Sequence, residues 1–126
     1  MSALLEVRDL VVRFGDRRSL ASLVTGRSNS ITAVAGTSFA MAEGETFALV
    51  GESGSGKTTL ARALIGLTPV ASGSVLFQGQ STLGLAGAAL KRLHRDIAMI
   101  FQDPVGSLSP RFTVRGLLAE PFRIHG

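Results

Sequence analysis

Residues 51–59 read Gly51-Glu52-Ser53-Gly54-Ser55-Gly56-Lys57-Thr58-Thr59. This stretch fits the pattern G-x-x-x-x-G-K-[ST], a glycine-rich loop whose backbone N–H groups surround nucleotide phosphates. The apolar run Phe47–Val50 precedes it, and the stretch Leu60–Gly66 that follows has the composition of a helix. A strand, a glycine loop and a helix in this order are the context in which the pattern binds phosphate. Residues 51–59 are therefore predicted to hold a nucleotide.

Each residue type in this loop suits a triphosphate, which is a dense negative charge. The glycines at 51, 54 and 56 lack a Cβ, so the backbone is free to fold tightly and turn its N–H groups inward. A helix that begins near Gly56 adds the positive end of its dipole. Lys57 is expected to reach the β- and γ-phosphates, and Thr58 to offer its hydroxyl to Mg²⁺. Further hydroxyl donors come from Ser53, Ser55 and Thr59.

The composition limits the class of protein. A length of 126 residues suits one domain, and 45% hydrophobic residues are enough to build a core. Cysteine is absent, which excludes a disulfide framework and thiolate chemistry. Glu6, Arg8 and Asp9 interrupt any secretory signal near the N-terminus. No apolar run approaches the ~20 residues that a membrane helix needs.

The net charge of +4 raises the question of nucleic-acid binding. The basic residues are dispersed, however, with one local cluster at Lys91, Arg92 and Arg95. The seven aromatic residues are all Phe and show no stacking pattern. We therefore expect a solvated basic surface beside a phosphate site, and no nucleic-acid partner.

Hydrophobic periodicity predicts further elements around the loop. Strands are expected at 4–8, 11–14, 37–41, 46–50, 74–77 and 97–101, and helices at 60–66, 83–93 and 114–119. The polar stretch 16–32 is interpreted as a flexible insertion. Pro121 is expected to end the last helix.

The segments on both sides of the loop resemble the ATP-binding cassette transporter ATPases, and in particular the subunits that drive oligopeptide, dipeptide and nickel importers. The resemblance covers nearly the whole chain. The phosphate loop is generic, whereas the blocks after it are specific to the importer group. The matching blocks are 33–39, 42–46, 49–59, 72–75, Phe101-Gln102-Asp103-Pro104, Ser107-Leu108-Ser109-Pro110-Arg111 and Ala119-Glu120-Pro121.

The resemblance implies an α/β fold in which a P-loop NTPase core carries an antiparallel β subdomain. Residues 1–126 would be the N-terminal part of one nucleotide-binding domain, truncated before its helical subdomain is complete, with the phosphate loop at 51–59 and a glutamine loop at 101–111. It also implies ATP and Mg²⁺ as cofactors and a second ATPase subunit as partner. Transmembrane permease subunits would be contacted near Asp103–Arg111. The implied location is cytoplasmic, peripheral on the inner face of the cell membrane.

The resemblance assigns roles to individual residues. Lys57 and Gln102 would be catalytic, and Gln102 would also join Thr58 as a Mg²⁺ ligand while sensing the γ-phosphate. Phe14 falls where the family places an aromatic that stacks on adenine; a core Phe is the alternative. Two departures are small: Thr58 replaces the commoner Ser, and Ser109 replaces the usual Asn. The ATP contacts would be Phe14, Gly51, Glu52, Ser53, Gly54, Ser55, Gly56, Lys57, Thr58 and Thr59.

The other catalytic parts of the family do not occur in these 126 residues. There is no Leu-Ser-Gly-Gly-Gln signature, and no apolar run that ends in an Asp-Glu pair. Neither His94 nor His125 follows a plausible late strand, so neither is expected to be the switch histidine. We therefore expect this chain to bind Mg·ATP weakly and to hydrolyse it poorly. A chain that stops within the fold is also expected to expose apolar patches and aggregate.

Two alternatives remain open. One is a nucleotide-binding module without turnover, such as a truncated product that sequesters nucleotide or a partner subunit. The other is a small kinase or GTPase, in which Asp103, after the apolar run 97–101, would be the Mg²⁺ ligand. Against the second, Gln102 intervenes, Pro104 follows at once, and no Asn-Lys-x-Asp sequence for guanine is present.

Overall fold

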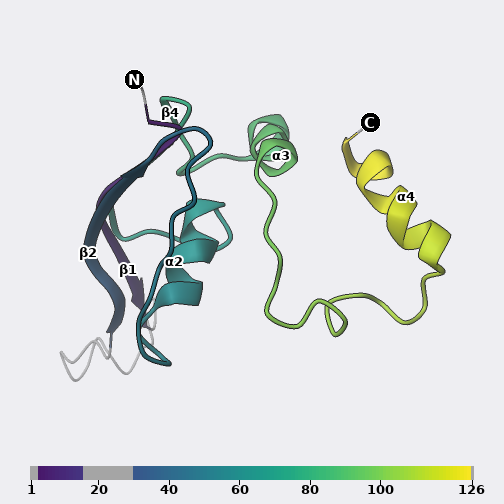
Figure 1. The fold of residues 1–126 in the computed structure, drawn as a ribbon, viewed down its shortest axis with the longest axis horizontal. Coiled ribbons are helices and arrows are strands. Elements are labelled where there is room, and N and C mark those ends of the chain that lie inside the picture. Colours follow the sequence, from purple (N-terminus) through teal and green to yellow (C-terminus); the bar gives the residue numbers. More distant parts are fainter. Residues whose placement is uncertain (1–2, 16–29, 126) are drawn as a thin grey trace, which may run out of the picture. The chain divides into compact units, whose positions relative to one another are not determined.

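The computed structural model describes residues 3–15 and 30–125, which form two compact units, Met1–Leu85 and Ala86–Gly126. The first contains all the strands among the described residues and one helix, and the second contains two helices (Figure 1). The elements are β1 (Leu5–Phe14), β2 (Ile31–Met41), α2 (Lys57–Leu64), β3 (Ser72–Phe77), β4 (Gln80–Ser81), α3 (Gly87–Asp96) and α4 (Val114–His125).

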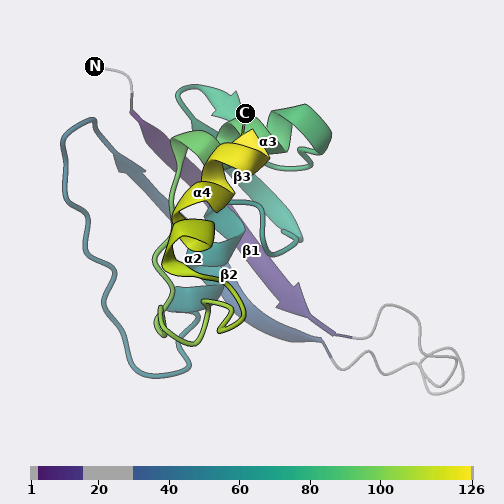
Figure 2. The ribbon, with the colours of Figure 1, turned by 90° about the vertical axis from the view of Figure 1, so that its right-hand side faces the viewer.

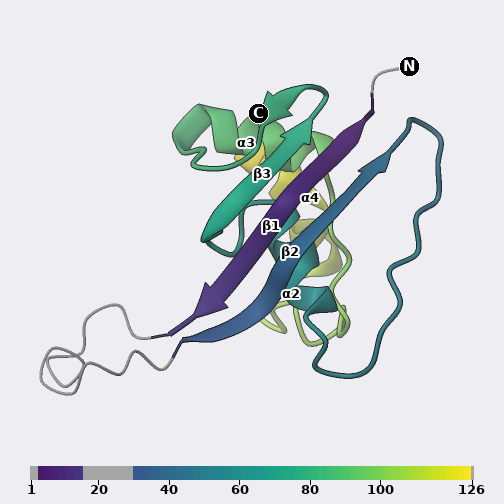
Figure 3. The same ribbon diagram turned by 90° about the vertical axis from the view of Figure 1, so that its left-hand side faces the viewer.

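The sheet of the first unit is antiparallel, with the strand order β2-β1-β3-β4. Figure 3 shows β1 between β2 and β3. A two-residue turn joins β3 to β4, because Phe77 pairs with Gln80. Gln78 and Gly79 both have positive φ, 49° and 76°, as the tightest hairpin turns require. The antiparallel β subdomain expected from the sequence is confirmed.

A bulge in β1 keeps the apolar residues of this strand on one face. Asp9 has a φ of 46°, and the pairing of β1 with both neighbouring strands shifts there. Strict alternation after Leu5 and Val7 would point Asp9 and Val11 at the core; the extra residue turns Leu10 and Val12 inward instead. The sequence predicted two strand pieces around Asp9, and the structure joins them into one bulged strand.

Helix α2 packs against the inward face of the sheet (Figure 2). It contributes two buried side chains, Leu60 and Ala63, three positions apart on one helix face. The buried cluster consists of Leu5, Val7, Leu10, Val12, Val34, Leu60, Ala63 and Val75. Because α2 follows the phosphate loop directly, this packing fixes one end of the loop against the sheet.

Two apolar stretches predicted to be buried strands, Thr46–Val50 and Ile97–Phe101, are not strands. Large side chains in both remain in solvent: Val50 is 87% exposed and Ile100 is 88% exposed. Phe47 stacks on Phe39 of β2, with ring centroids 4.8 Å apart. A strand buried on both faces needs hydrogen-bonded neighbours, and the sheet described here offers these stretches none. The prediction fails because apolar composition favours burial but cannot supply a partner strand.

The helices of the second unit differ from prediction at their ends. Helix α3 begins at Gly87 and not near Leu83, since Gly84 has a left-handed φ of 71°. Helix α4 continues through Pro121, because proline costs one hydrogen bond but fixes φ near its helical value. Of the predicted insertion 16–32, residues 16–29 lie outside the described residues. Its last residues, 31 and 32, already belong to β2.

Candidate functional site

The phosphate loop forms a left-handed bend that ends in the first turn of α2. Gly54 and Gly56 have φ values of 81° and 93°, which favour glycine strongly. Gly56 is the N-cap residue of α2, no side chain caps this helix end, and its first turn contains no acidic residue. The first N–H groups of α2 are therefore left for a ligand, and the positive end of the helix dipole is uncompensated by a side chain.

Gly56 also joins the loop to the sheet. A Cβ built on Gly56 would collide with the carbonyl oxygen of Ala33 in β2 and would touch Val34. Close approach of the two backbones is thus possible only because residue 56 is glycine. The contact sets the distance between the loop and β2. The loop pattern contains no hint of this role for Ala33, which is small and lies far upstream.

Lys57 folds back over its own loop. Its Nζ donates to the carbonyl oxygens of Gly51 and Glu52 at 2.7 and 2.6 Å, and to Ser55 Oγ at 3.3 Å. These acceptors hold the ammonium group above the loop. A phosphate oxygen is a stronger, charged acceptor, so the same donors are suited to a bound triphosphate.

Two hollows border the loop. The larger, of about 320 Å³, lies between β2 and the loop and is lined by Ala33, Val34, Ala35, Thr37, Leu49, Val50, Gly51, Ser55, Gly56, Lys57 and Leu60. The smaller, of about 170 Å³, is lined by Ala33, Gly54, Gly56, Lys57, Thr58 and Thr59. A cation, hydroxyl groups and helix N–H groups thus converge on one space. Such a set of donors suits a phosphate group, and the exposed Thr58 hydroxyl is a hard oxygen ligand of the kind that Mg²⁺ prefers.

The two other predicted site residues lie elsewhere in the chain. Phe14 ends β1 opposite Ile31 and is 46% exposed, so it is a surface aromatic and not part of the buried cluster. Gln102 is exposed and belongs to the second unit. The role of Phe14 at adenine and that of Gln102 at Mg²⁺ stay predictions.

Asp103 shapes the loop that follows Gln102. Its Oδ1 accepts a hydrogen bond from the Gly106 N–H at 2.9 Å, and its carbonyl accepts one from Ser107 Oγ at 2.8 Å. A Cβ on Gly106 would collide with the Asp103 carboxylate. The carboxylate is thus engaged in a turn, and residues 97–101 before it form no strand. Both observations weaken the kinase or GTPase alternative.

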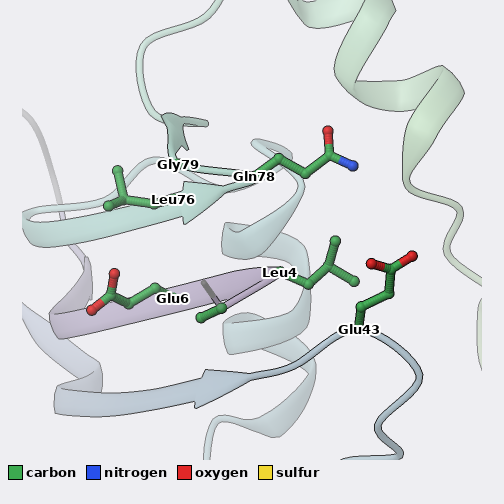
Figure 4. Close-up of a pocket in the computed structure, with 7 residues that line it drawn as sticks. Leu4, Glu6, Glu43, Leu76, Gln78 and Gly79 are labelled. Carbon is green, nitrogen blue, oxygen red and sulfur yellow. The ribbon is translucent and has the colours of Figure 1, made fainter. Parts of the chain in front are cut away.

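A further hollow of about 320 Å³ lies at the end of the sheet, where β1 begins and β3 ends (Figure 4). Its lining includes the carboxylates of Glu6 and Glu43 but no cation. In Figure 4, Leu4, Glu43 and Gln78 extend in one direction, and Glu6 extends in the other. Glu6 is paired with Arg8 at 2.6 Å. This negative, partly apolar hollow does not suit a phosphate, so residues 51–59 stay the candidate nucleotide site.

The chain is similar in sequence to curated proteins of known name. The chain is 48% identical over 123 residues to the glutathione import ATP-binding protein GsiA of Salmonella paratyphi A. It is 47% identical over 122 residues to the GsiA protein of Escherichia coli strain K12. These matches cover 98% and 97% of this chain but only 19% of each relative. The chain therefore spans about a fifth of the length of the curated relatives it matches.

A family model adds a second, independent comparison. The model described as "ABC transporter" matches residues 34–120, which include the phosphate loop and the Gln102 loop. No helix among the described residues combines the length and apolar character needed to cross a bilayer. The match covers well over half of the chain, and it agrees with the antiparallel sheet and the phosphate loop. The chain belongs to the ABC transporter family, as part of its ATP-binding domain.

Proposed function

We propose that this chain is the phosphate-binding part of an ATPase subunit that powers a peptide-type importer. The observation that carries the proposal is the convergence of Lys57, the free N-terminus of α2 and the Thr58 hydroxyl on one hollow. Support comes from the relatives, which are named as glutathione import ATP-binding proteins. A small peptide, of which glutathione is an example, is therefore the proposed class of transported solute.

The loop residues bind and orient the triphosphate. The N–H groups at the start of α2 and the Lys57 ammonium would surround the β- and γ-phosphates, so charge would be neutralised without covalent chemistry. Thr58 and Gln102 are the residues that would hold Mg²⁺, which when bound supplies further neutralisation of the phosphate charge. Gln102 would also orient the attacking water, and Phe14 would stack on adenine. Glu52, Ser53, Ser55 and Thr59 complete the polar surround.

The proposed partners follow the family. A second ATPase subunit would close over the bound nucleotide, and permease subunits would meet the loop Asp103–Arg111. That loop is exposed throughout, and its apolar side chains Val105 and Leu108 are 78% and 53% exposed. We place the subunit in the cytoplasm, peripheral on the inner face of the cell membrane, with no nucleic-acid partner.

A phosphate-release assay tests the proposed reaction. On the 126-residue chain we expect little or no release, because no signature sequence and no Asp-Glu pair occur in it. In a longer protein that contains those parts, we expect steady release that Lys57→Ala abolishes and Gln102→Ala lowers. Release by the longer protein that persists undiminished in Lys57→Ala would contradict the proposal.

The second candidate is nucleotide binding without turnover. It is favoured for the 126-residue chain by the absence of a general base from the sequence. Steady phosphate release by this chain, lost in Lys57→Ala, would contradict it. A screen with labelled ATP and small-molecule acceptors examines the remaining kinase alternative; transfer of label to an acceptor would favour a kinase over both other candidates.

A further inference from the structure

Helix α3 presents a face made of cations. Its sequence is Gly-Ala-Ala-Leu-Lys-Arg-Leu-His-Arg-Asp. At the helical 3.6 residues per turn, Lys91, Arg92 and Arg95 fall within about 100° of one another. All three side chains are exposed, whereas Leu93, which lies on the opposite side, is buried. The helix is therefore amphipathic, with its basic face in solvent.

Acidic side chains among the described residues neutralise little of the charge on this face. Among the described residues, Lys91 and Arg92 have no hydrogen-bonded or ionic partner. Arg95 has one ion pair, with the neighbouring Asp96 at 3.8 Å, and both side chains are at least half exposed. Exposed pairs of this kind contribute little. Lys91 and Arg95 are four positions apart, a spacing at which like charges destabilise a helix. An external anion would relieve that repulsion.

Most of the net positive charge of the chain belongs to the second unit. Residues 86–126 contain six Lys and Arg side chains against three Asp and Glu side chains, a net charge of +3. Residues 1–85 contain seven against six, a net charge of +1. An anionic surface would therefore attract the second unit more strongly than the first.

We propose that the Lys91–Arg92–Arg95 face of α3 binds the anionic phosphate headgroups of a lipid membrane. The face lies on the outward side of a helix, and no α3 residue lines any of the hollows described above. Long, flexible cations on a solvent-exposed face suit an array of anionic headgroups, which attracts nearby Lys and Arg side chains. The inference goes beyond the nucleotide site, and its failure would leave ATP binding untouched.

Vesicle sedimentation with the full 126-residue chain tests this assignment. The probes are vesicles of phosphatidylcholine alone and of phosphatidylcholine mixed equally with phosphatidylglycerol. The test variant is K91Q/R92Q/R95Q, in which Gln keeps a similar helix propensity. The matched control is R111Q/R115Q/R123Q, which removes the same charge from exposed residues of the same unit. Circular dichroism checks that both variants keep their helices.

We expect the chain to bind the mixed vesicles far better than phosphatidylcholine alone. The α3 variant should lose roughly a hundredfold in partitioning, as three cations near an anionic surface predict. The control should lose much less, and rising salt should weaken the binding of the unchanged chain. Equal losses in both variants, or equal binding to both vesicles, would overturn the assignment. Binding to polyglutamate without binding to mixed vesicles would also overturn it, in favour of an acidic protein segment.

If the triple variant fails to fold, two other measurements test whether the α3 face binds headgroups. Lys91→Arg keeps the charge, so it should bind mixed vesicles as the unchanged chain does. The salt dependence of the unchanged chain needs no variant at all. Binding that is insensitive to salt would contradict an electrostatic headgroup contact.

Discussion

Gly56 holds the phosphate loop against the sheet through a backbone contact. Its φ of 93° is left-handed, and the Ala33 carbonyl occupies the space where a Cβ would lie. Gly54 has a similar φ of 81° but no atom within 4 Å of the corresponding position. A side chain at residue 54 would therefore meet backbone strain alone, whereas a side chain at residue 56 would meet both backbone strain and a steric collision.

We predict that Gly56→Ala destabilises the chain more than Gly54→Ala does. Gly54→Ala adds left-handed strain of about 1–2 kcal/mol. Gly56→Ala adds a similar strain and a further ~1–3 kcal/mol for the collision with β2. Urea unfolding followed by circular dichroism measures the difference. Equal losses in the two variants would mean that Ala33 does not support the loop.

The sequence indicates which loop residues could bind phosphate but not what supports the loop. Glycine, lysine and threonine at fixed spacing carry the chemistry of phosphate binding within nine neighbouring residues. Ala33 supports the loop from a separate strand, through its backbone alone. A backbone contact leaves no signature in the side chains, so only the structure reveals it.

At the scale of elements, the bulge at Asp9 determines which side of β1 is apolar. Ser38 Oγ accepts a hydrogen bond from the Asp9 N–H at 2.8 Å and donates to Asp9 Oδ1 at 3.2 Å. Opposite this point, a Cβ on Gly73 would collide with the Asp9 carbonyl. Both neighbouring strands therefore accommodate the extra residue.

Deletion of Asp9 should be tolerated, because the remaining residues keep Leu10 and Val12, both 0% exposed, in strict alternation on the core face. The deletion should cost about 1 kcal/mol, as Ser38→Ala should, since both remove only the exposed hydrogen bonds between these two residues. The contrasting variant is deletion of Val11, which breaks the alternation and turns one large apolar side chain of β1 out of the core, at a cost of at least ~2 kcal/mol. Thermal melts compare the variants, and an Asp9 deletion that melts as low as the Val11 deletion would contradict the bulge's role.

Local sequence predicted the helices and most strands of the sheet, whereas the antiparallel arrangement followed from the family resemblance. Local sequence failed where an element depends on a distant partner. The residues of Thr46–Val50 favour a strand, but a strand forms only beside another strand. Pro121 was predicted to end a helix, and α4 passes through it. In both places the structure depends on contacts with other parts of the chain, and the intrinsic propensity of the local residues does not include those contacts.

Replacement of Pro121 should strengthen α4. Proline removes the hydrogen bond to the carbonyl of Leu117 and crowds that carbonyl. Pro121→Ala should therefore increase helical ellipticity and stabilise α4 by up to about 3 kcal/mol. Glu120→Ala is the matched control, since Glu and Ala have similar helix propensities. A fall in helicity for Pro121→Ala would show that proline fixes the conformation of this segment.

At the scale of the molecule, α4 exposes an apolar stripe. Val114, Leu118 and Phe122 follow one another at four-residue intervals and are 74%, 69% and 78% exposed. Residues at this spacing share one helix face. No residue of α4 is buried. A contiguous apolar stripe of this kind favours self-association in water.

The double variant Leu118→Lys/Phe122→Lys should reduce that self-association without lowering the melting temperature, because both side chains are in solvent. Analytical ultracentrifugation measures the change. The control Leu60→Lys places a charge in the buried cluster, where the side chain is 4% exposed, and should unfold the first unit. A sharp, cooperative melt of the unchanged chain as a pure monomer would contradict the predicted aggregation.

A titration of the chain with a fluorescent ATP analogue tests whether residues 51–59 hold the phosphates of ATP. The chain contains two lysines, Lys57 and Lys91, so Lys91→Ala is a charge-matched control. Loss of a charge-assisted contact in Lys57→Ala should weaken binding by about tenfold to a hundredfold, whereas Lys91→Ala should leave it unchanged. Equal affinity in Lys57→Ala and the unchanged chain would show that Lys57 does not hold the phosphates.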